Sequence, residues 1–300
     1  MFTFLLKRRV TQFCLFVLFS IFSTVAFAQQ PGDAWGYVCG FTVGNLQQGN
    51  LYQFDKANGA ETLIGTPNCG TIRLFTGEFI DGTYYMMDND NGRLVSIAAD
   101  GTCTNIGAST FNGTVSGLSH DVTTGITYLM SIVIGQTSLY TINISTGETT
   151  LVGTNSGTGI SLVIDGKGNA YQIGLNNDQV NTIDLATAAV TPGPAITRNG
   201  NPVNLNFAQD IDADCDDATG ELIGIIYEGG GTGRLGTIDP STGVFTERAF
   251  VGSEVCGFSV NNNVPVAQAP IPTMSQWGLM IFGLLIVNMS VVLIRRREIA

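Results

Sequence analysis

The sequence predicts an all-β chain folded as a five-bladed β-propeller, and three observations lead to this prediction. A short β-prone unit recurs five times, with starts 41 to 55 residues apart. The chain is rich in glycine, with 38 among 300 residues, and no helical segment separates the repeats. The repeats also begin one strand short and end with one strand to spare. Four short strands in about 43 residues, repeated in tandem, are typical of propeller blades.

The recurrent unit supplies the third strand of each blade. Its five copies are Leu51–Asp55, Leu94–Ala98, Leu139–Asn143, Val180–Asp184 and Leu235–Asp239. The last interval is the longest because it contains the insert Pro192–Pro202, which is rich in Pro, Asn and Gly.

The segments around each unit supply the other three strands. After the third copy, the turn Ser145–Gly147 leads into the β-prone run Glu148–Gly153, and upstream lie the runs Val115–Asp121 and Ile126–Val133. Glycine provides the positive φ of a tight hairpin, while Thr, Val and Ile favour strands. Each repeat therefore predicts four short antiparallel strands.

The two ends of the repeat region predict how the ring closes. The first repeat lacks its innermost strand and begins at Ala34–Val43, which aligns with second-strand segments. After the fifth repeat the chain continues into Val255–Val260, and this spare strand would complete the first blade. The propeller then spans residues 34–262. Six or seven degenerate blades are the main alternative, whereas a solenoid or sandwich would not explain the missing and spare strands.

The same two ends carry a candidate disulfide. Cys39 and Cys256 lie in the near-identical strings VCGFTV and VCGFSV, on strands that the closed ring makes neighbours. We therefore hypothesise a Cys39–Cys256 bond; the alternative is that the cysteines are small buried hydrophobic residues. Without a CxxC pair and with a single histidine, a structural zinc site is disfavoured.

The chain begins and ends with segments typical of export. Residues 1–28 have a basic start, an apolar run and an A-x-A arrangement at Ala26–Ala28, which predicts a signal peptide. Residues 278–294 are apolar and precede Arg295, Arg296 and Arg297, which predicts a transmembrane helix with a stop-transfer signal. Residues 263–270 form a Pro-containing spacer.

The residues before that helix carry a resemblance to a known signal. Residues 271–278 read IPTMSQWG, followed by the helix and the arginines. This arrangement resembles the IPTL-type C-terminal sorting signal, a relative of the PEP-type signal, with Met274 where leucine is usual. The motif positions are Ile271, Pro272, Thr273, Met274, Trp277 and Gly278. The resemblance implies a Gram-negative bacterium, recognition by an exosortase (a membrane-embedded transpeptidase), and delivery of a membrane-anchored precursor to the cell surface or extracellular matrix.

The charge distribution excludes nucleic acid as a binding partner and favours cations as ligands. The net charge is −11, but the residues between the basic ends hold 7 basic and 23 acidic residues, a net charge of −16. Nucleic-acid binding depends on cationic side chains, so it is not expected. Asp210, Asp212, Asp214 and Asp216 alternate in the manner of calcium ligands, as do the oxygens of Asp88–Gly92. Both strings lack the EF-hand glutamate, and both also suit ordinary turns. No other cofactor is predicted.

These observations favour a non-catalytic, exported propeller that binds glycans or surface proteins through its loops. The alternative is a secreted carboxylate-dependent hydrolase or lyase with a site at the channel mouth, with or without calcium. Glycoside hydrolysis would need two carboxylates across a pocket, and the sequence singles out no such pair. His120, the lone histidine, is a candidate acid/base but is more simply read as a solvated turn residue.

Overall fold

The computed structural model describes residues 34–40, 42, 44–70, 73–133, 135–206, 210–213 and 222–261, with only the backbone described at 210–213. The predicted signal peptide, spacer, sorting motif Ile271–Gly278 and helix 278–294 lie outside these residues. Within the described ranges, no helix has the length and apolar character needed to cross a membrane.

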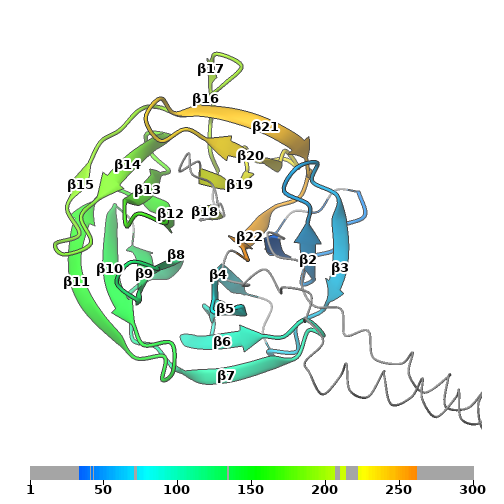
Figure 1. The fold of residues 1–300 in the computed structure, drawn as a ribbon, viewed down its shortest axis with the longest axis vertical. Helices are drawn as coiled ribbons and strands as arrows, with labels where there is room; N and C mark the ends of the chain where they lie inside the picture. Colours follow the sequence, from blue (N-terminus) through cyan, green and yellow to red (C-terminus); the bar gives the residue numbers. More distant parts are fainter. Residues whose placement is uncertain are drawn as a thin grey trace, which may run out of the picture. The chain divides into compact units, whose positions relative to one another are not determined.

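The described strands form five blades arranged in a ring, which confirms the five-bladed β-propeller and makes the alternative of six or seven blades wrong (Figure 1). From the inner to the outer strand, blade 1 is β22 (Val255–Val260), β1 (Ala34–Val38), β2 (Leu51–Phe54) and β3 (Glu61–Gly65). Blade 2 is β4 (Leu74–Ile80), β5 (Thr83–Asp88), β6 (Arg93–Ile97) and β7 (Cys103–Ala108). Blade 3 is β8 (Thr114–Asp121), β9 (Ile126–Val133), β10 (Gln136–Ile142) and β11 (Thr149–Ser156). Blade 4 is β12 (Gly159–Ile164), β13 (Ala170–Gly174), β14 (Gln179–Ile183) and β15 (Val190–Thr191). Blade 5 begins with β18 (Asp210–Ala213), β19 (Leu222–Ile226), β20 (Arg234–Ile238) and β21 (Val244–Phe250).

The last strand closes the ring as the spare-strand argument predicts. β22 pairs antiparallel with β1, with Ala34 opposite Val260 and Val38 opposite Val255. The innermost strand of blade 1 therefore comes from the far end of the repeat region, about 220 residues after the strand it pairs with.

Blade 5 departs from the predicted four antiparallel strands. The insert forms a hairpin of β16 (Thr197–Arg198) and β17 (Asn201–Pro202), which extends beyond β21 in Figure 1. β16 pairs with β21 in parallel, so this sheet has six strands. The insert thus adds an edge to its blade in addition to lengthening the repeat.

The acidic or amide residue that ends most repeat units anchors the next turn. Its side-chain oxygen accepts the N–H two residues later at 2.8 to 2.9 Å, and its carbonyl accepts the N–H four residues later at 2.7 to 2.8 Å. The four anchors are Asp55, Asn143, Asp184 and Asp239. The turn ends with positive φ, which glycine provides at Gly59, Gly147 and Gly243. The geometry of the turn therefore explains why Asp or Asn, followed by glycine, recurs in the repeat sequence.

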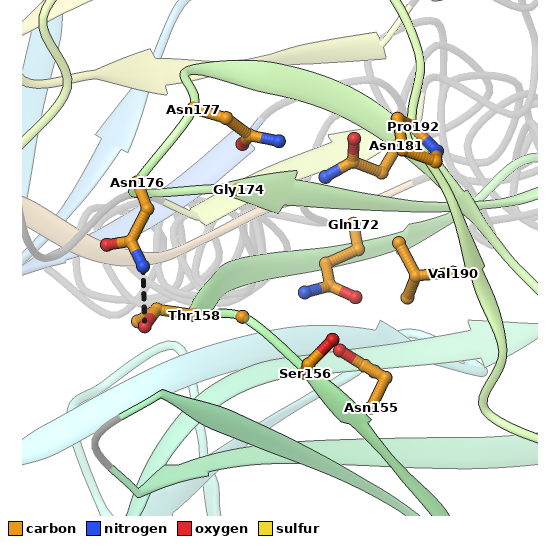
Figure 2. A pocket seen from close by; sticks show the side chains of 11 residues that line it. Asn155, Ser156, Thr158, Gln172, Gly174, Asn176, Asn177, Asn181, Val190 and Pro192 are labelled. Carbon is orange, nitrogen blue, oxygen red and sulfur yellow. Dashed lines mark hydrogen bonds between the residues drawn. The ribbon is translucent and has the colours of Figure 1, made fainter.

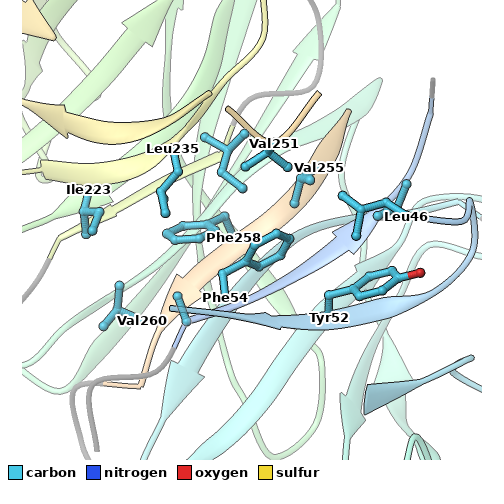
Figure 3. Packing of buried hydrophobic residues seen from close by; sticks show 12 residues of the cluster. Leu46, Tyr52, Phe54, Ile223, Leu235, Val251, Val255, Phe258 and Val260 are labelled. Atoms are coloured by element: carbon cyan, nitrogen blue, oxygen red, sulfur yellow. The ribbon is translucent and has the colours of Figure 1, made fainter. Parts of the chain in front are cut away.

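The hydrophobic core lies between the blades. The described residues form five buried clusters, and each cluster joins two neighbouring blades. Figure 3 shows the cluster at the closure, where Phe54 and Phe258 of blade 1 pack against Ile223 and Leu235 of blade 5. Since strand side chains alternate between the two faces of a sheet, both faces of each blade can be buried in this way.

Hydrogen bonds that serine side chains accept also join neighbouring inner strands. Ser259 Oγ in β22 accepts the N–H of Phe79 in β4 at 2.9 Å, and Ser119 Oγ in β8 accepts the N–H of Ile164 in β12 at 3.0 Å. A Cβ added at Gly117 would lie 2.6 Å from the backbone nitrogen of Leu162, so glycine permits this close approach.

Candidate functional site

The described residues form two disulfides, one at the ring closure and one that joins the segment before blade 2 to its outer strand. Cys39 and Cys256 are bonded across the closure, with an S–S distance of 2.03 Å and a sequence separation of 217 residues. This is the pair that the matching strings suggested. Cys69 and Cys103 form a second bond across 34 residues, which the sequence analysis did not anticipate because their neighbouring residues do not match. Cys215 lies outside the described residues.

The calcium hypothesis at the aspartate string remains a prediction. Asp210 and Asp212 lie on β18, where their backbones pair with Ile225 and Ile223. Asp214 and Asp216 lie outside the described residues. In the described part of the chain, no three His, Cys, Asp or Glu residues gather in a way that could hold a metal ion.

The second acidic string folds as a turn that is closed by an arginine. The side chain of Asp88 is fully buried and accepts hydrogen bonds from the Asp90 N–H at 3.1 Å, Asn91 Nδ2 at 2.7 Å and Arg93 Nε at 2.8 Å. Arg93 also donates to the Cys69 carbonyl at 2.6 Å. The guanidinium supplies the positive charge at this carboxylate, which agrees with the turn interpretation of Asp88–Gly92.

His120 lies near the end of β8 and contacts a hydroxyl. Its Nδ1 is 2.9 Å from Thr127 Oγ1. Burial lowers the pKa of His120, while the charges of Asp81 and Asp121 raise it by smaller amounts. Both oxygens of Asp121 accept hydrogen bonds within its own turn, from Thr123 and Thr124. The Asp121 carboxylate therefore stabilises the turn in preference to orienting the imidazole.

The inner strands offer few groups for acid/base chemistry. Among their described side chains, Glu78 is the one carboxylate that does not anchor a turn. It is 6% exposed, and Ser259 Oγ donates to its Oε1 at 3.4 Å. Hydrolysis by paired carboxylates needs two such groups within about 5 to 10 Å. The described inner-strand side chains provide no second one.

A cavity of about 420 Å³ lies between blades 3 and 4 (Figure 2). Its lining contains five side-chain amides and no charged group. The amides are Asn155 on β11, Gln172 on β13, Asn176 and Asn177 in the following turn, and Asn181 on β14. Val190 and Pro192 form an apolar wall, which Figure 2 shows beside the amides.

The cavity lies where the outer strand of blade 4 is interrupted. β15 has two residues, whereas the outer strands of the other blades have five to eight. Pro192 follows β15 directly and has no N–H to donate, so the regular ladder is interrupted there. Pairing with β14 resumes where the Val180 N–H donates to the Pro194 carbonyl at 3.0 Å and Gln179 bridges Ala195. The next N–H, that of Gly193, donates to the Asn181 side chain at 3.3 Å, so a side-chain oxygen replaces a ladder acceptor.

Several polar atoms of the cavity lack a partner in the protein. Gln172 is 2% exposed, and its Oε1 accepts no hydrogen bond. Neither the Oδ1 nor the Nδ2 of Asn155 has a partner, although both atoms are buried. By contrast, Asn176 Nδ2 donates to Thr158 Oγ1 at 3.5 Å, and Asn177 Nδ2 donates to Gln179 Oε1 at 2.6 Å. The sequence carries only a weak signal for these amides, because asparagine also favours turns and Gln172 lies within a β-prone run.

Comparisons with known proteins show distant structural likeness. No family model matches the chain, and no curated protein matches it. Virginiamycin B lyase from Staphylococcus aureus is similar at 13% identity, with a TM-score of 0.40, over 67% of this chain and 62% of that one. The nidogen/laminin complex gives 12% identity and a TM-score of 0.46 over 71% and 77% of the two chains. Glutaminyl cyclase from Myxococcus xanthus gives 17% identity and a TM-score of 0.43 over 60% and 70%. The strand pairing itself establishes the fold, and no ligand or partner is transferred from these proteins.

Proposed function

We propose that this chain is an exported binding protein whose propeller is a rigid, non-catalytic scaffold presented at the cell surface or in the extracellular matrix. The observation that supports export most directly is the pair of disulfides, Cys39–Cys256 and Cys69–Cys103. Structural disulfides form and persist in oxidising compartments such as the periplasm and the cell exterior. The signal peptide expected at residues 1–28 supplies the matching route.

Delivery through a C-terminal sorting signal is the second part of the proposal. The motif at residues 271–278, the apolar segment and Arg295–Arg297 have the order that an exosortase-type transpeptidase would recognise. In this scheme the precursor is anchored by its C-terminal helix, and transpeptidation then releases the propeller from that helix.

Binding is proposed in preference to catalysis because of the residues along the inner strands. Glu78 is buried and bonded to Ser259, and Asp121 is engaged in its turn. The alternative, a hydrolase or lyase that uses paired carboxylates, therefore gains no support from the described side chains.

Mass spectrometry of the C-terminus tests the sorting proposal. The protein is purified from cells with and without exosortase activity, alongside a Pro272→Ala variant. We expect a shortened C-terminus for the wild-type chain only when the exosortase is active, and an intact tail for the variant. An intact wild-type tail in both strains would overturn the sorting proposal.

A further inference from the structure

We propose that the cavity between blades 3 and 4 binds a neutral saccharide through the carboxamides of Gln172, Asn155 and Asn181. This inference rests on the proposed binding function and assigns it a site and a ligand class. It depends on the repeat comparison, the unpartnered amides and the charge of the lining.

The first argument comes from comparison among the blades. Gln172 and Asn181 face each other across β13 and β14. The register of the other blades places aliphatic residues, methionine, tyrosine or glycine at the same cross-strand position, and none of them carries an amide. These pairs are Gly36 with Tyr52, Met86 with Val95, Leu129 with Tyr140, and Gly224 with Gly236. Blade 4 alone replaces this pair with two amides, so the fold does not require them.

The second argument is the free-energy cost of burying these amides without hydrogen-bond partners. A buried carboxamide oxygen without a partner is unfavourable, because it loses its hydrogen bonds to water and gains none. Gln172 Oε1 and both polar side-chain atoms of Asn155 are buried and have no partner. Such groups are expected where a ligand or ordered water completes the hydrogen bonding.

A second cavity provides an internal contrast. It lies on blade 1, measures about 310 Å³, and is also lined by amides, including Gln47 and Asn50. There the buried amide has a partner, because Asn50 Oδ1 accepts from Thr66 Oγ1 at 2.5 Å. Gln47 is exposed, and its backbone N–H donates to the Tyr52 hydroxyl at 3.0 Å. A polar lining alone therefore does not indicate a ligand site. The buried atoms without partners distinguish the cavity of blade 4 from the one on blade 1.

The third argument concerns the ligand class. The lining holds neither the cations that an anion needs nor the carboxylates that a metal ion needs. Each carboxamide carries both donors and acceptors, which match hydroxyl groups that also donate and accept. The volume of about 420 Å³ lies within the range of small-molecule sites. A peptide added to a sheet would instead use backbone groups along a strand edge, whereas this lining presents side chains. These features favour a sugar.

Glycine makes room for the converging side chains. A Cβ added at Gly174 would lie 2.1 Å from Asn177 Oδ1 and 2.9 Å from Asn181 Nδ2. A Cβ at Gly159 would lie 2.1 Å from Gln172 Nε2. The backbone at both positions leaves the space that the amides occupy.

The test combines a binding screen with an isosteric substitution. The purified full chain is screened against arrayed neutral oligosaccharides, acidic oligosaccharides and peptides, and the strongest neutral binder is then titrated by calorimetry. Gln172→Met keeps the side-chain volume and removes the amide. The double variant Gln172→Met with Asn181→Val copies the pair of blade 2, and Gln47→Met makes the same change at the second cavity.

We expect a neutral saccharide to bind the wild-type chain and the Gln47→Met protein equally, and to bind Gln172→Met about tenfold or more weakly. The thermal midpoint of Gln172→Met should equal or exceed that of the wild type, because an unpartnered buried oxygen has been removed. If Gln172→Met lowers the midpoint and also loses binding, the double variant separates misfolding from loss of the site. Its Met–Val pair already folds in blade 2, so it should keep the wild-type midpoint and still fail to bind.

Three results would overturn the inference: no neutral saccharide binds, binding survives in Gln172→Met and the double variant, or only peptides or acidic ligands bind in a Gln172-dependent way. If a saccharide binds and these substitutions do not change its affinity, the proposed binding function stands and only this site is excluded. Failure of C-terminal processing would contradict the sorting proposal without affecting this site.

Discussion

Removal of the disulfide that closes the ring should destabilise the protein more than removal of the shorter one. The Cys39–Cys256 bond joins residues 217 positions apart, and the Cys69–Cys103 bond joins residues 34 positions apart. In the chain-entropy description, a cross-link stabilises by restricting the unfolded chain, and the effect grows with the logarithm of the loop length. The longer bond then contributes about 5 kcal/mol and the shorter one about 4 kcal/mol at 25 °C.

The experiment uses two double variants, Cys39→Ser with Cys256→Ser and Cys69→Ser with Cys103→Ser, so that neither leaves an unpaired thiol from the lost bond. Urea unfolding of the purified full chain gives the free energy of unfolding and its denaturant dependence for each. We expect both variants to fold, because β22 still pairs with β1 and the closure cluster around Phe54 and Phe258 stays buried. The ring-closing variant should lose about 1 to 2 kcal/mol more than the other. An equal or smaller loss would refute the reasoning, since it would mean that the length of the loop closed in the unfolded chain does not set the difference between the two bonds.

Three further predictions concern buried groups. Arg93→Met should lower the free energy of unfolding by about 3 kcal/mol, because Asp88 is fully buried and loses its counter-charge; millimolar calcium should not restore stability in urea unfolding. As the one histidine in the sequence, His120 should give a single NMR titration with a pKa below its ordinary value. As the pH falls through about 6.5, the unfolded chain takes up this proton first, so stability should decrease, and His120→Gln should flatten that dependence. Thr76→Gly should raise stability by about 1 kcal/mol in urea unfolding, because Thr76 has a φ of +45° and a buried hydroxyl without a partner; Gly257, at φ +59°, shows that glycine suits the bulge of an inner strand. A loss of stability in Thr76→Gly would contradict this explanation.

The sequence predicted the ring because its strongest signals are local and repeated. The unit ending in Asp or Asn reports a turn whose hydrogen bonds are made within five residues, as at Asp239 and Gly243. The matching sequences around Cys39 and Cys256 belong to two strands that pair with each other. Patterns of this kind need no knowledge of distant contacts.

The features that the sequence did not predict depend on tertiary context. The parallel pairing of β16 with β21 involves two residues, Thr197 and Arg198, which is too short for alternation to be visible. Cys69 and Cys103 share no matching string, so only the folded positions bring them together. Gln172 lies within an ordinary β-prone run, and whether its amide has a partner is decided by the neighbouring blade.

The repeat architecture also explains how one blade can carry unfavourable polar groups. Each blade packs mainly against its two neighbours, so a departure in blade 4 affects the layers on its two faces and leaves the closure between blades 5 and 1 unchanged. On the face toward blade 5, Ile173 and Val180 remain in the apolar cluster, while Gln172 and Asn181 line the cavity toward blade 3. Because strand side chains alternate, these two amides can change one face of the sheet without disturbing the other. A propeller closed by a paired strand and a disulfide can therefore hold such a site in one of its blades while the other four keep the ring intact.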